Sequence, residues 1–338
     1  MTAPVSVALV GLGWWGKKML AVLSEASDHL SVMRIVESDE KSARQYCEGQ
    51  PITVGASLEE ALSDPDIDAV IIATPHSFHQ EQVMAAAAAG KHVFCEKPLA
   101  LTRVDAIAMT TACQEAGVVL GMGHERRFEP PVRDLLERAA KGELGRIHQI
   151  EANFSHDRFL RLDQDNWRLR GDQAPAGGMT ATGIHLLDLS TVLLGRAEKV
   201  WSVCENLSSD LPAGDTVAAY VHFVGGGTSY VSASLANPFI SRFSVFGSKG
   251  WVDIRDKAHV EAPDGWVVTR AETDGPIEVS EVAATEPVRD NLISFARAVR
   301  GEESYPITHQ QMIDNISLLE AISRSAVSGE LTAVDGGV

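Results

Sequence analysis

The chain has 338 residues, of which 45% are hydrophobic, and this length suits two domains that each bury a core. Its 46 acidic and 29 basic residues give a net charge of −17, which would repel nucleic-acid phosphates and anionic lipid, so neither is an expected partner. The chain has no run of 18 apolar residues, no basic leader before Gly11 and no paired CxxC cysteines, so we expect a cytoplasmic protein without a membrane partner or a zinc site.

The first part of the chain alternates short apolar runs with amphipathic stretches, which is the pattern of a parallel sheet covered by helices. Strands are predicted at residues 5–11, 30–36, 52–54, 68–73, 92–95 and 118–120. Helices are predicted at residues 15–24, 38–47, 58–62, 81–89 and 103–116. We therefore expect an α/β Rossmann domain, with a doubly wound parallel sheet, over residues 1–123.

The pattern changes after Gly123. Periodicity predicts helices at 131–141 and 182–194, a long strand at 146–154, alternating strand runs between 200 and 268, and two helices within 287–327. Three glycines at 225–227 predict a hairpin turn. Residues 124–338 are therefore expected to form an α+β domain with a large, mostly antiparallel open sheet, whose C-terminal helix could pack back on the first domain.

A glycine-rich turn, GLGWWG, joins the first predicted strand to the first predicted helix. Gly11, Gly13 and Gly16 have the GxGxxG spacing of a dinucleotide site, in which glycines allow a tight turn, approach of the pyrophosphate and close helix packing. Trp14 and Trp15 belong to the same turn and are also expected to contact the cofactor. Glu37 ends the second strand, where a carboxylate binds ribose hydroxyls and repels a 2′-phosphate, so NAD is favoured over NADP.

Several segments together resemble one family, the glucose-fructose oxidoreductase and inositol dehydrogenase family (Gfo/Idh/MocA). They are GLGWWG, ATPHSFH at 73–79, CEKPLALT at 95–102, GGMTATGIHLLD at 177–188, FGSKGWVDI at 246–254 and the C-terminal LLEAISRSAVSG. The resemblance implies hydride transfer between NAD(P) and a carbohydrate or polyol carbon. It also implies an open sheet that carries substrate contacts and an oligomer interface, so a homodimer or homotetramer is expected.

The same resemblance implies roles for individual residues. Lys97 matches the lysine that binds the reacting oxygen, and His185 matches the histidine that exchanges its proton. Both residue types suit the oxidation of an alcohol, which needs a proton acceptor and a positive charge beside the developing alkoxide. The remaining residues expected to line the cofactor are Thr74, Pro75, His76, His79, Glu96 and Pro98. The two histidines of that set are not expected to bind a metal, because no cluster of carboxylates or cysteines accompanies them.

Substrate contacts are expected from the second domain and the segment that enters it. The candidates are Glu125, Arg126, Arg127, Asn153, His156, Arg158, Trp167 and Thr182. The charged residues at 125–127 could instead form a structural salt bridge. Ala181 stands where the family's common pattern has an aspartate, so we expect His185 to be held by water, Thr182 or substrate, and Asp188 to have a structural role of its own.

The pattern favours an NAD-dependent oxidoreductase that acts on a secondary alcohol or ketone of a sugar, polyol or related cyclic substrate. A dihydrodiol dehydrogenase and an NAD-assisted glycosidase-like member remain open as alternatives within the family. A third alternative is a non-catalytic NAD(H)-binding sensor, but a sensor has no need of the Lys97 and His185 pair.

Overall fold

The computed structural model describes residues 3–260 and 262–335, and the chain divides into two compact units. Unit 1 contains Met1–Glu125 and Pro287–Met312, and unit 2 contains Arg126–Glu286 and Ile313–Val338. The sequence predicts a second domain over residues 124–338 whose C-terminal helix could pack back on the first domain. The segment at 287–312 belongs instead to unit 1, because its apolar side chains pack there.

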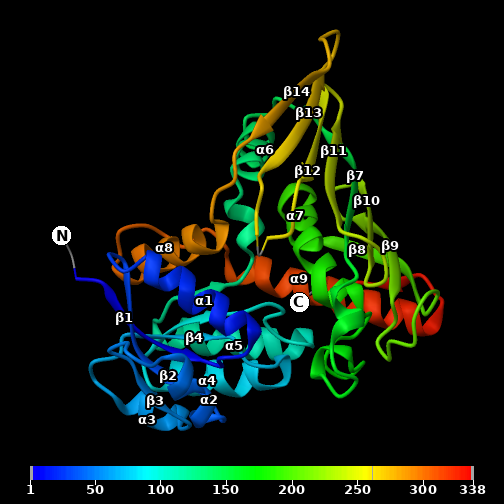
Figure 1. The fold of residues 1–338 in the computed structure, drawn as a ribbon. Coiled ribbons are helices and arrows are strands. Elements are labelled where there is room, and N and C mark those ends of the chain that lie inside the picture. The colour runs from blue at the N-terminus through cyan, green and yellow to red at the C-terminus, as the bar shows by residue number, and fades with distance from the viewer. Residues whose placement is uncertain (1–2, 261, 336–338) are drawn as a thin grey trace. The chain divides into compact units, whose positions relative to one another are not determined.

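Unit 1 is built on a six-stranded sheet in the order β3-β2-β1-β4-β5-β6, with every pairing parallel (Figure 1). The strands are β1 (Val5–Val10), β2 (Leu30–Val36), β3 (Thr53–Gly55), β4 (Ala69–Ile72), β5 (His92–Cys95) and β6 (Leu120–Met122). The strand order reverses between β1 and β4, so the loops at their carboxyl ends diverge and leave room for a ligand. This confirms the predicted Rossmann fold.

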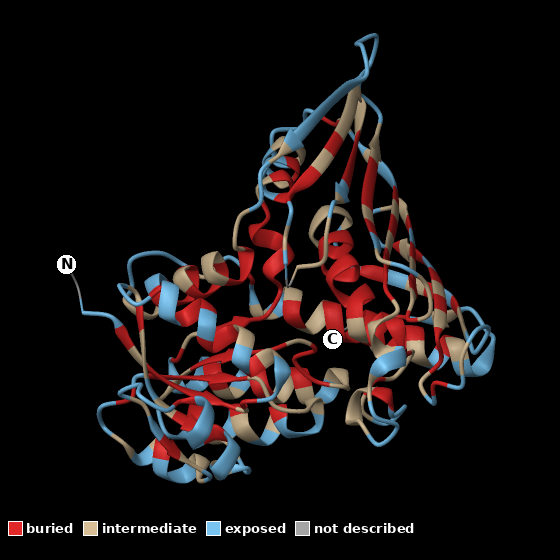
Figure 2. Cartoon of the chain, in the orientation of Figure 1, coloured by how far each residue is buried: buried red, intermediate tan, exposed pale blue. Residues whose placement is uncertain are grey.

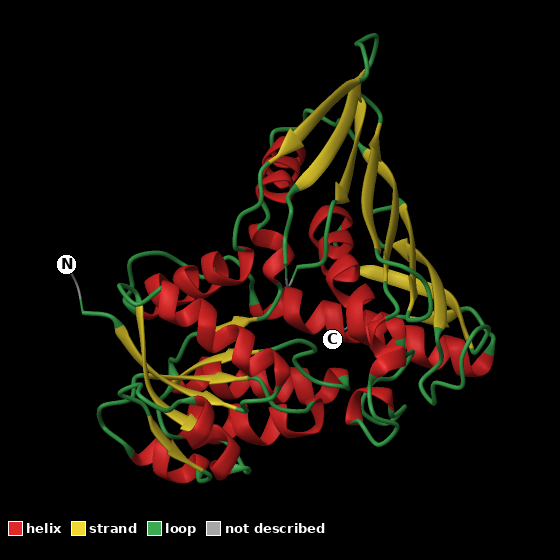
Figure 3. Cartoon of the chain, in the orientation of Figure 1, coloured by secondary structure: helices red, strands yellow, loops and turns green. Residues whose placement is uncertain are grey.

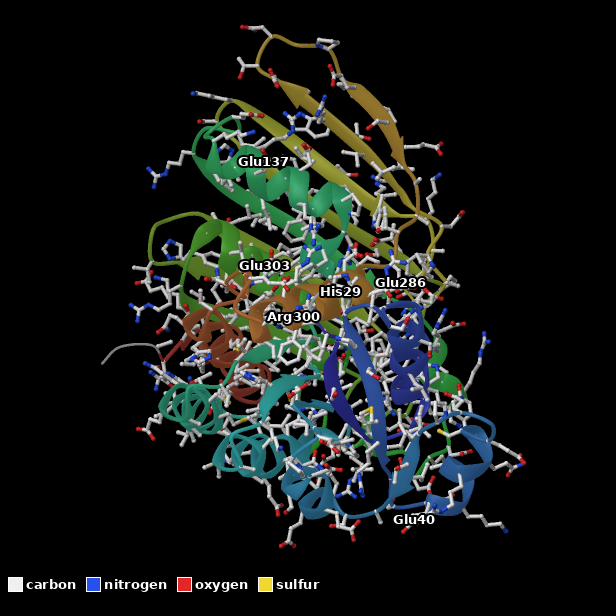
Figure 4. The ribbon with its side chains drawn as sticks, turned by 90° about the vertical axis from the view of Figure 1, so that its left-hand side faces the viewer. His29, Glu40, Glu137, Glu286, Arg300 and Glu303 are labelled. Carbon is white, nitrogen blue, oxygen red and sulfur yellow. The ribbon has the colours of Figure 1, made fainter. Side chains whose placement is uncertain are left out.

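Helices lie on both faces of this sheet (Figure 1). They are α1 (Trp14–Glu25), α2 (Glu40–Tyr46), α3 (Leu58–Ser63), α4 (His79–Ala88), α5 (Arg103–Ala116) and α8 (Pro287–Val299). α1 packs against α8, and α4 packs against α5. After α8, the Arg300 guanidinium lies 3.1 Å from the His29 ring nitrogen and 3.2 Å from the His29 carbonyl oxygen. Figure 4 labels both residues, which lie near each other in that view.

Local signals explain where these helices begin and end. Ser57 accepts a hydrogen bond from the Glu60 amide and caps α3, as predicted. Gly90, with φ of +71°, follows α4. Several predicted boundaries differ from the structure by one or two residues. For example, β6 begins at Leu120, not Val118, because the Val118 amide still bonds the Cys113 carbonyl at the left-handed end of α5.

Unit 2 is built on a nine-stranded sheet in the order β14-β13-β12-β11-β7-β10-β9-β8-β15 (Figure 3). Among the strands that the structure describes here, β7 and β10 are the one pair that runs in parallel. The strands are β7 (Ile147–Ser155), β8 (Ala197–Glu205), β9 (Thr216–Phe223), β10 (Thr228–Ser234), β11 (Ile240–Gly247), β12 (Gly250–Asp256), β13 (Trp266–Glu272), β14 (Glu278–Val282) and β15 (Thr332–Ala333). The predicted hairpin at Gly225–Gly227 joins β9 to β10. The mostly antiparallel sheet is confirmed, although neither edge strand was predicted.

The helices of unit 2 are α6 (Pro130–Ala140), α7 (Ile184–Leu194) and, from Ile313 on, α9 (His309–Ser328). α7 packs against β7 and β10, and α6 packs against β12. α7 is buried along its first two turns, as the red ribbon of Figure 2 shows, and a π-helical turn at Met179–Gly183 precedes it. Among the described residues, no helix is long and apolar enough to cross a membrane.

Candidate functional site

The glycine turn at the end of β1 has the geometry of a pyrophosphate site. Gly11 has φ of +92°, and a Cβ there would lie 2.9 Å from the Ala73 carbonyl oxygen. A Cβ at Gly16 would overlap the Gly11 carbonyl, so close packing requires both glycines. A Cβ at Gly13 would meet no heavy atom within 4 Å. Gly13 is also the N-cap of α1 and offers no side-chain cap, which leaves the positive end of the helix suited to a phosphate.

Glu37 lies next to this turn, at the end of β2. Its Oε2 accepts a hydrogen bond of 2.7 Å from the Leu12 amide, and its Oε1 accepts bonds from the Ser38 hydroxyl and the Asp39 amide. Burial alone would raise the pKa of Glu37, but these hydrogen bonds outweigh it and lower the pKa. The carboxylate is therefore charged at neutral pH and fixed beside the glycine turn.

The segment from Glu96 to Pro98 follows β5 at the same edge of the sheet. Lys97 is partly exposed, whereas Glu96 is buried and its Oε2 accepts a bond from the Lys97 amide. Burial raises the pKa of Glu96, and the charge of Lys97 acts in the opposite direction. A Cβ at Gly123 would lie 2.7 Å from the Glu96 carboxyl carbon, so this glycine makes room for the carboxyl group. The Lys97–Pro98 peptide bond is cis.

The other cofactor candidates of unit 1 differ in exposure. Trp14 is 52% exposed and its ring centroid lies 5.7 Å from that of Trp15. Thr74 and Pro75 follow β4, and the Thr74 hydroxyl donates to Gln82. His76 is half-buried, while His79 is fully buried and contacts only protein groups through both ring nitrogens.

In unit 2, His185 lies in the first turn of α7 and is 3% exposed. The Thr182 hydroxyl lies 2.7 Å from the Phe154 carbonyl oxygen and 3.1 Å from that of Gly178. Ala181 packs against an apolar cluster formed by Leu169, Leu211 and Leu235. The position that carries an aspartate in the family's common pattern is therefore part of a small hydrophobic core in this chain.

Two arginines that were candidates for substrate binding form buried ion pairs. Arg127 binds Asp188 through two hydrogen bonds, Nε to Oδ2 at 2.7 Å and Nη2 to Oδ1 at 2.6 Å. Arg126 contacts Glu129, Asp256 and the Ser241 hydroxyl. Of the two roles that the sequence left open for this segment, these contacts favour the structural one, and they give Asp188 the structural role expected of it.

Of the remaining substrate candidates, Asn153, His156 and Arg158 lie in or just after the end of β7, whereas Glu125 belongs to unit 1. Glu125 is buried, and Asn153 donates a hydrogen bond to the Ser232 hydroxyl. His156 is buried, and its Nδ1 accepts a hydrogen bond from the Arg158 amide.

Neighbouring residues that the sequence did not single out complete this part of unit 2. His156 packs in a ring cluster with Phe154, Phe159 and His259. Arg168 lies over the Trp167 ring at 4.2 Å, and burial lowers the pKa of Arg168 to about 10. No motif marks His259, because only contacts between segments far apart in the sequence bring it to His156 and Phe154.

Each unit thus assembles one group of candidate residues. Unit 1 gathers the glycine turn, Glu37, Thr74 and Lys97 at the carboxyl ends of β1, β2, β4 and β5. Unit 2 gathers Thr182, His185 and the Arg127–Asp188 pair around the start of α7. In the described part of the chain, no group of three or more His, Cys, Asp or Glu side chains could hold a metal ion.

The fold and the glycine turn define a dinucleotide-binding oxidoreductase. Residues 5–124 match the model of the Gfo/Idh/MocA oxidoreductase family with its NAD-binding Rossmann fold, and residues 132–253 match a C-terminal domain of the same family. The chain therefore belongs to the Gfo/Idh/MocA family, as its motifs predicted, and it is an NAD(P)-dependent oxidoreductase of the sugar and polyol class.

Individual relatives agree with this assignment. The chain is 28% identical to D-xylose 1-dehydrogenase (NADP(+)) 2 of Haloferax volcanii, over 97% of this chain and 99% of that protein. It is 30% identical to 1,5-anhydro-D-fructose reductase of Ensifer adhaerens, over 83% and 84% of the two chains. In fold it is similar to the aldose-aldose oxidoreductase of Caulobacter crescentus, crystallised with glycerol, with a TM-score of 0.86 and 24% identity over 98% and 99% of the chains.

Proposed function

We propose that this protein is an NAD-dependent dehydrogenase of a secondary hydroxyl on a sugar, polyol or related cyclic substrate, or the reductase of the corresponding ketone. The observation that supports it best is the position of Lys97. It is a partly exposed lysine at the carboxyl end of β5, in the same sheet edge as a glycine turn with room for a pyrophosphate. A binding module would need the turn but not the lysine.

The glycine turn and Glu37 would hold NAD, which would supply the hydride acceptor for the substrate carbon when bound. The Lys97 ammonium binds the reacting oxygen and stabilises its developing negative charge. His185 takes the proton that leaves this oxygen, a role that suits imidazole because its unperturbed pKa of about 6.5 is near working pH. Formation of NADH with a panel of polyols and aldoses tests the proposal. A protein that binds NADH but turns over none of them would support the sensor alternative.

Glu37 supports the choice of NAD. Its carboxylate is held beside the glycine turn, where the 2′-phosphate of NADP would meet a second negative charge. The Haloferax relative is named for NADP(+), so similarity to it does not indicate NAD. The preference of this chain for NAD is inferred from its own Glu37.

We expect kcat/KM to favour NAD over NADP, and Glu37→Ser to narrow the ratio by about tenfold, which corresponds to removal of about 1.4 kcal/mol of repulsion. Steady-state kinetics with both cofactors measure this ratio. Asp39→Ser is the matched control, because Asp39 is an exposed acid two residues further on that caps α2. A wild-type preference for NADP would contradict the proposed role of Glu37.

We also propose that a second copy of the chain covers part of the nine-stranded sheet. Trp201, Tyr220 and Tyr230 are 45%, 49% and 47% exposed, and the strand registers place Tyr220 between the other two in one cross-strand row. Exposed aromatic rows of this kind are typical of protein interfaces.

Tyr220→Lys should therefore shift the protein from an oligomer towards the 36.3 kDa monomer, because it places a charge in the middle of the row. Light scattering after size-exclusion chromatography measures the mass. Tyr46→Lys, at a tyrosine of α2 that is 45% exposed, is the control and should leave the mass unchanged. A monomeric wild-type protein would contradict this proposal.

A further inference from the structure

His79 connects two loops of unit 1 from a fully buried position. It is 0% exposed and lies at the first residue of α4. Its Nδ1 lies 2.8 Å from the Pro98 carbonyl oxygen, and its Nε2 lies 3.0 Å from the Thr74 carbonyl oxygen. Pro98 directly follows Lys97 in the loop after β5, whereas Thr74 belongs to the loop after β4.

We infer that His79 is a positioning residue, which fixes the main chain that carries Lys97 against the loop expected to line the cofactor. The inference rests on the proposed function of Lys97. The sequence predicted that His79 itself contacts the cofactor, but a side chain with no exposed surface and with both ring nitrogens against protein carbonyls favours action through the two loops.

Neighbouring contacts of α4 support the same role. The Thr74 hydroxyl donates to Gln82 at 2.6 Å, so α4 holds this loop at a second point. Gln80 donates to Asp105 at 2.7 Å, and Asp105 is the residue whose amide is capped by Thr102 at the start of α5. α4 therefore contacts the main chain just after Lys97 and also the helix that follows the lysine loop.

The main-chain positions of these two loops affect where Lys97 lies and therefore the rate of the proposed reaction. β4 and β5 are paired neighbours, with Ile72 opposite Cys95, so the two loops leave the sheet side by side. A displacement of about 1 Å at a group that binds the reacting atoms can lower a rate by about 10²-fold. Lys97 is partly exposed at the end of its strand, so its position depends on what holds the adjacent Pro98 carbonyl.

Amide substitutions at His79 can test the contact of each ring nitrogen separately. Asparagine can place its NH2 group near the position of Nδ1, facing Pro98, and glutamine can place its NH2 group near the position of Nε2, facing Thr74. Phenylalanine keeps the ring volume and donates to neither carbonyl. The three variants therefore remove the Thr74 contact, the Pro98 contact or both.

We expect His79→Gln and His79→Phe to lower kcat by about 10- to 100-fold, and His79→Asn to keep kcat within about threefold of wild type. The dissociation constant of NADH, from fluorescence titration, should rise by about threefold or more in His79→Asn and His79→Phe and stay nearly constant in His79→Gln. Thermal melting checks that each variant is folded.

His92→Phe is the matched control. His92 is a half-buried histidine at the amino end of β5, where its Nδ1 accepts a bond from the Val119 amide. We expect this variant to melt at a lower temperature with its kcat unchanged, because it disturbs β5 at the end far from Lys97.

A double-mutant comparison shows whether His79 acts through Lys97. His79→Gln should have little further effect on the residual turnover of Lys97→Ala. Wild-type kcat in both folded amide variants, or an undiminished loss in the Lys97→Ala background, would overturn the inference. Failure of the proposed function itself is seen separately, as near-normal turnover of Lys97→Ala alone.

Discussion

Lys97→Ala should lower kcat by about 100-fold or more and change the dissociation constant of NADH by less than about threefold. The large effect is expected because the variant removes both the positive charge beside the reacting oxygen and one group able to exchange a proton with it. The small effect is expected because the pyrophosphate and ribose positions depend on the glycine turn and Glu37, which Lys97 does not hold.

Two further variants sharpen this test. Lys97→Arg keeps the positive charge but replaces the ammonium with a guanidinium that stays protonated, so a partial recovery of kcat would indicate that charge is the main contribution. Lys91→Ala is the matched control, since the Lys91 ammonium bonds the Asp64 and Ile67 carbonyl oxygens near the amino end of β5. It should lower stability and leave kcat unchanged. Near-normal turnover of Lys97→Ala would remove the basis of the proposed mechanism.

Much of unit 1 could be predicted from the sequence because its signals are local. The strands of the parallel sheet are continuous apolar runs, and the glycines of GLGWWG are required by contacts within the turn and with Ala73. Val118 shows the limit of such signals. Its apolar side chain extends the strand pattern, but its amide completes the end of α5, so the strand begins two residues later.

The partner of an amphipathic helix is not a local property. The pattern at 287–327 predicted two helices, but it did not indicate that α8 packs with unit 1. Asn291 and Tyr305 donate hydrogen bonds to the Met122 carbonyl oxygen at the end of β6, and the Phe295 ring lies 5.6 Å from that of Phe94. Gly121 is needed there, because a Cβ would lie 2.7 Å from the Phe295 ring. These contacts join residues more than a hundred positions apart.

Unit 2 shows the same limit at the candidate site. The segment GGMTATGIHLLD marks His185, but not the surroundings of Ala181, which come from Leu169 in a 3-10 turn, Leu211 in a loop and Leu235 just after β10. Nor does the sequence pair Arg127 with Asp188 across 61 positions. The residue types indicated which side chains could take part in catalysis. Long-range packing determined which of these side chains form structural contacts instead.

The Arg127–Asp188 pair gives the second large expected effect, on stability. Asp188→Asn should lower the free energy of unfolding by about 3–5 kcal/mol, because it leaves a buried guanidinium without its opposite charge. Both side chains are nearly inaccessible, at 6% and 2% exposure, so water cannot replace the lost carboxylate. Urea denaturation followed by tryptophan fluorescence measures the loss, provided that the transition is a single cooperative step.

A double substitution shows whether the unpaired charge causes the loss of stability in Asp188→Asn. Arg127→Met combined with Asp188→Leu removes both charges, and it should recover much of the lost stability because apolar side chains of similar volume can replace a buried ion pair. Asp172→Asn is the control, since its pair with Arg170 is exposed and screened by water, and the urea midpoint should hardly move. If Asp188→Asn were no more destabilising than Asp172→Asn, the buried pair would not be what holds the start of α7, and the orientation of His185 would have to depend on other contacts of that helix.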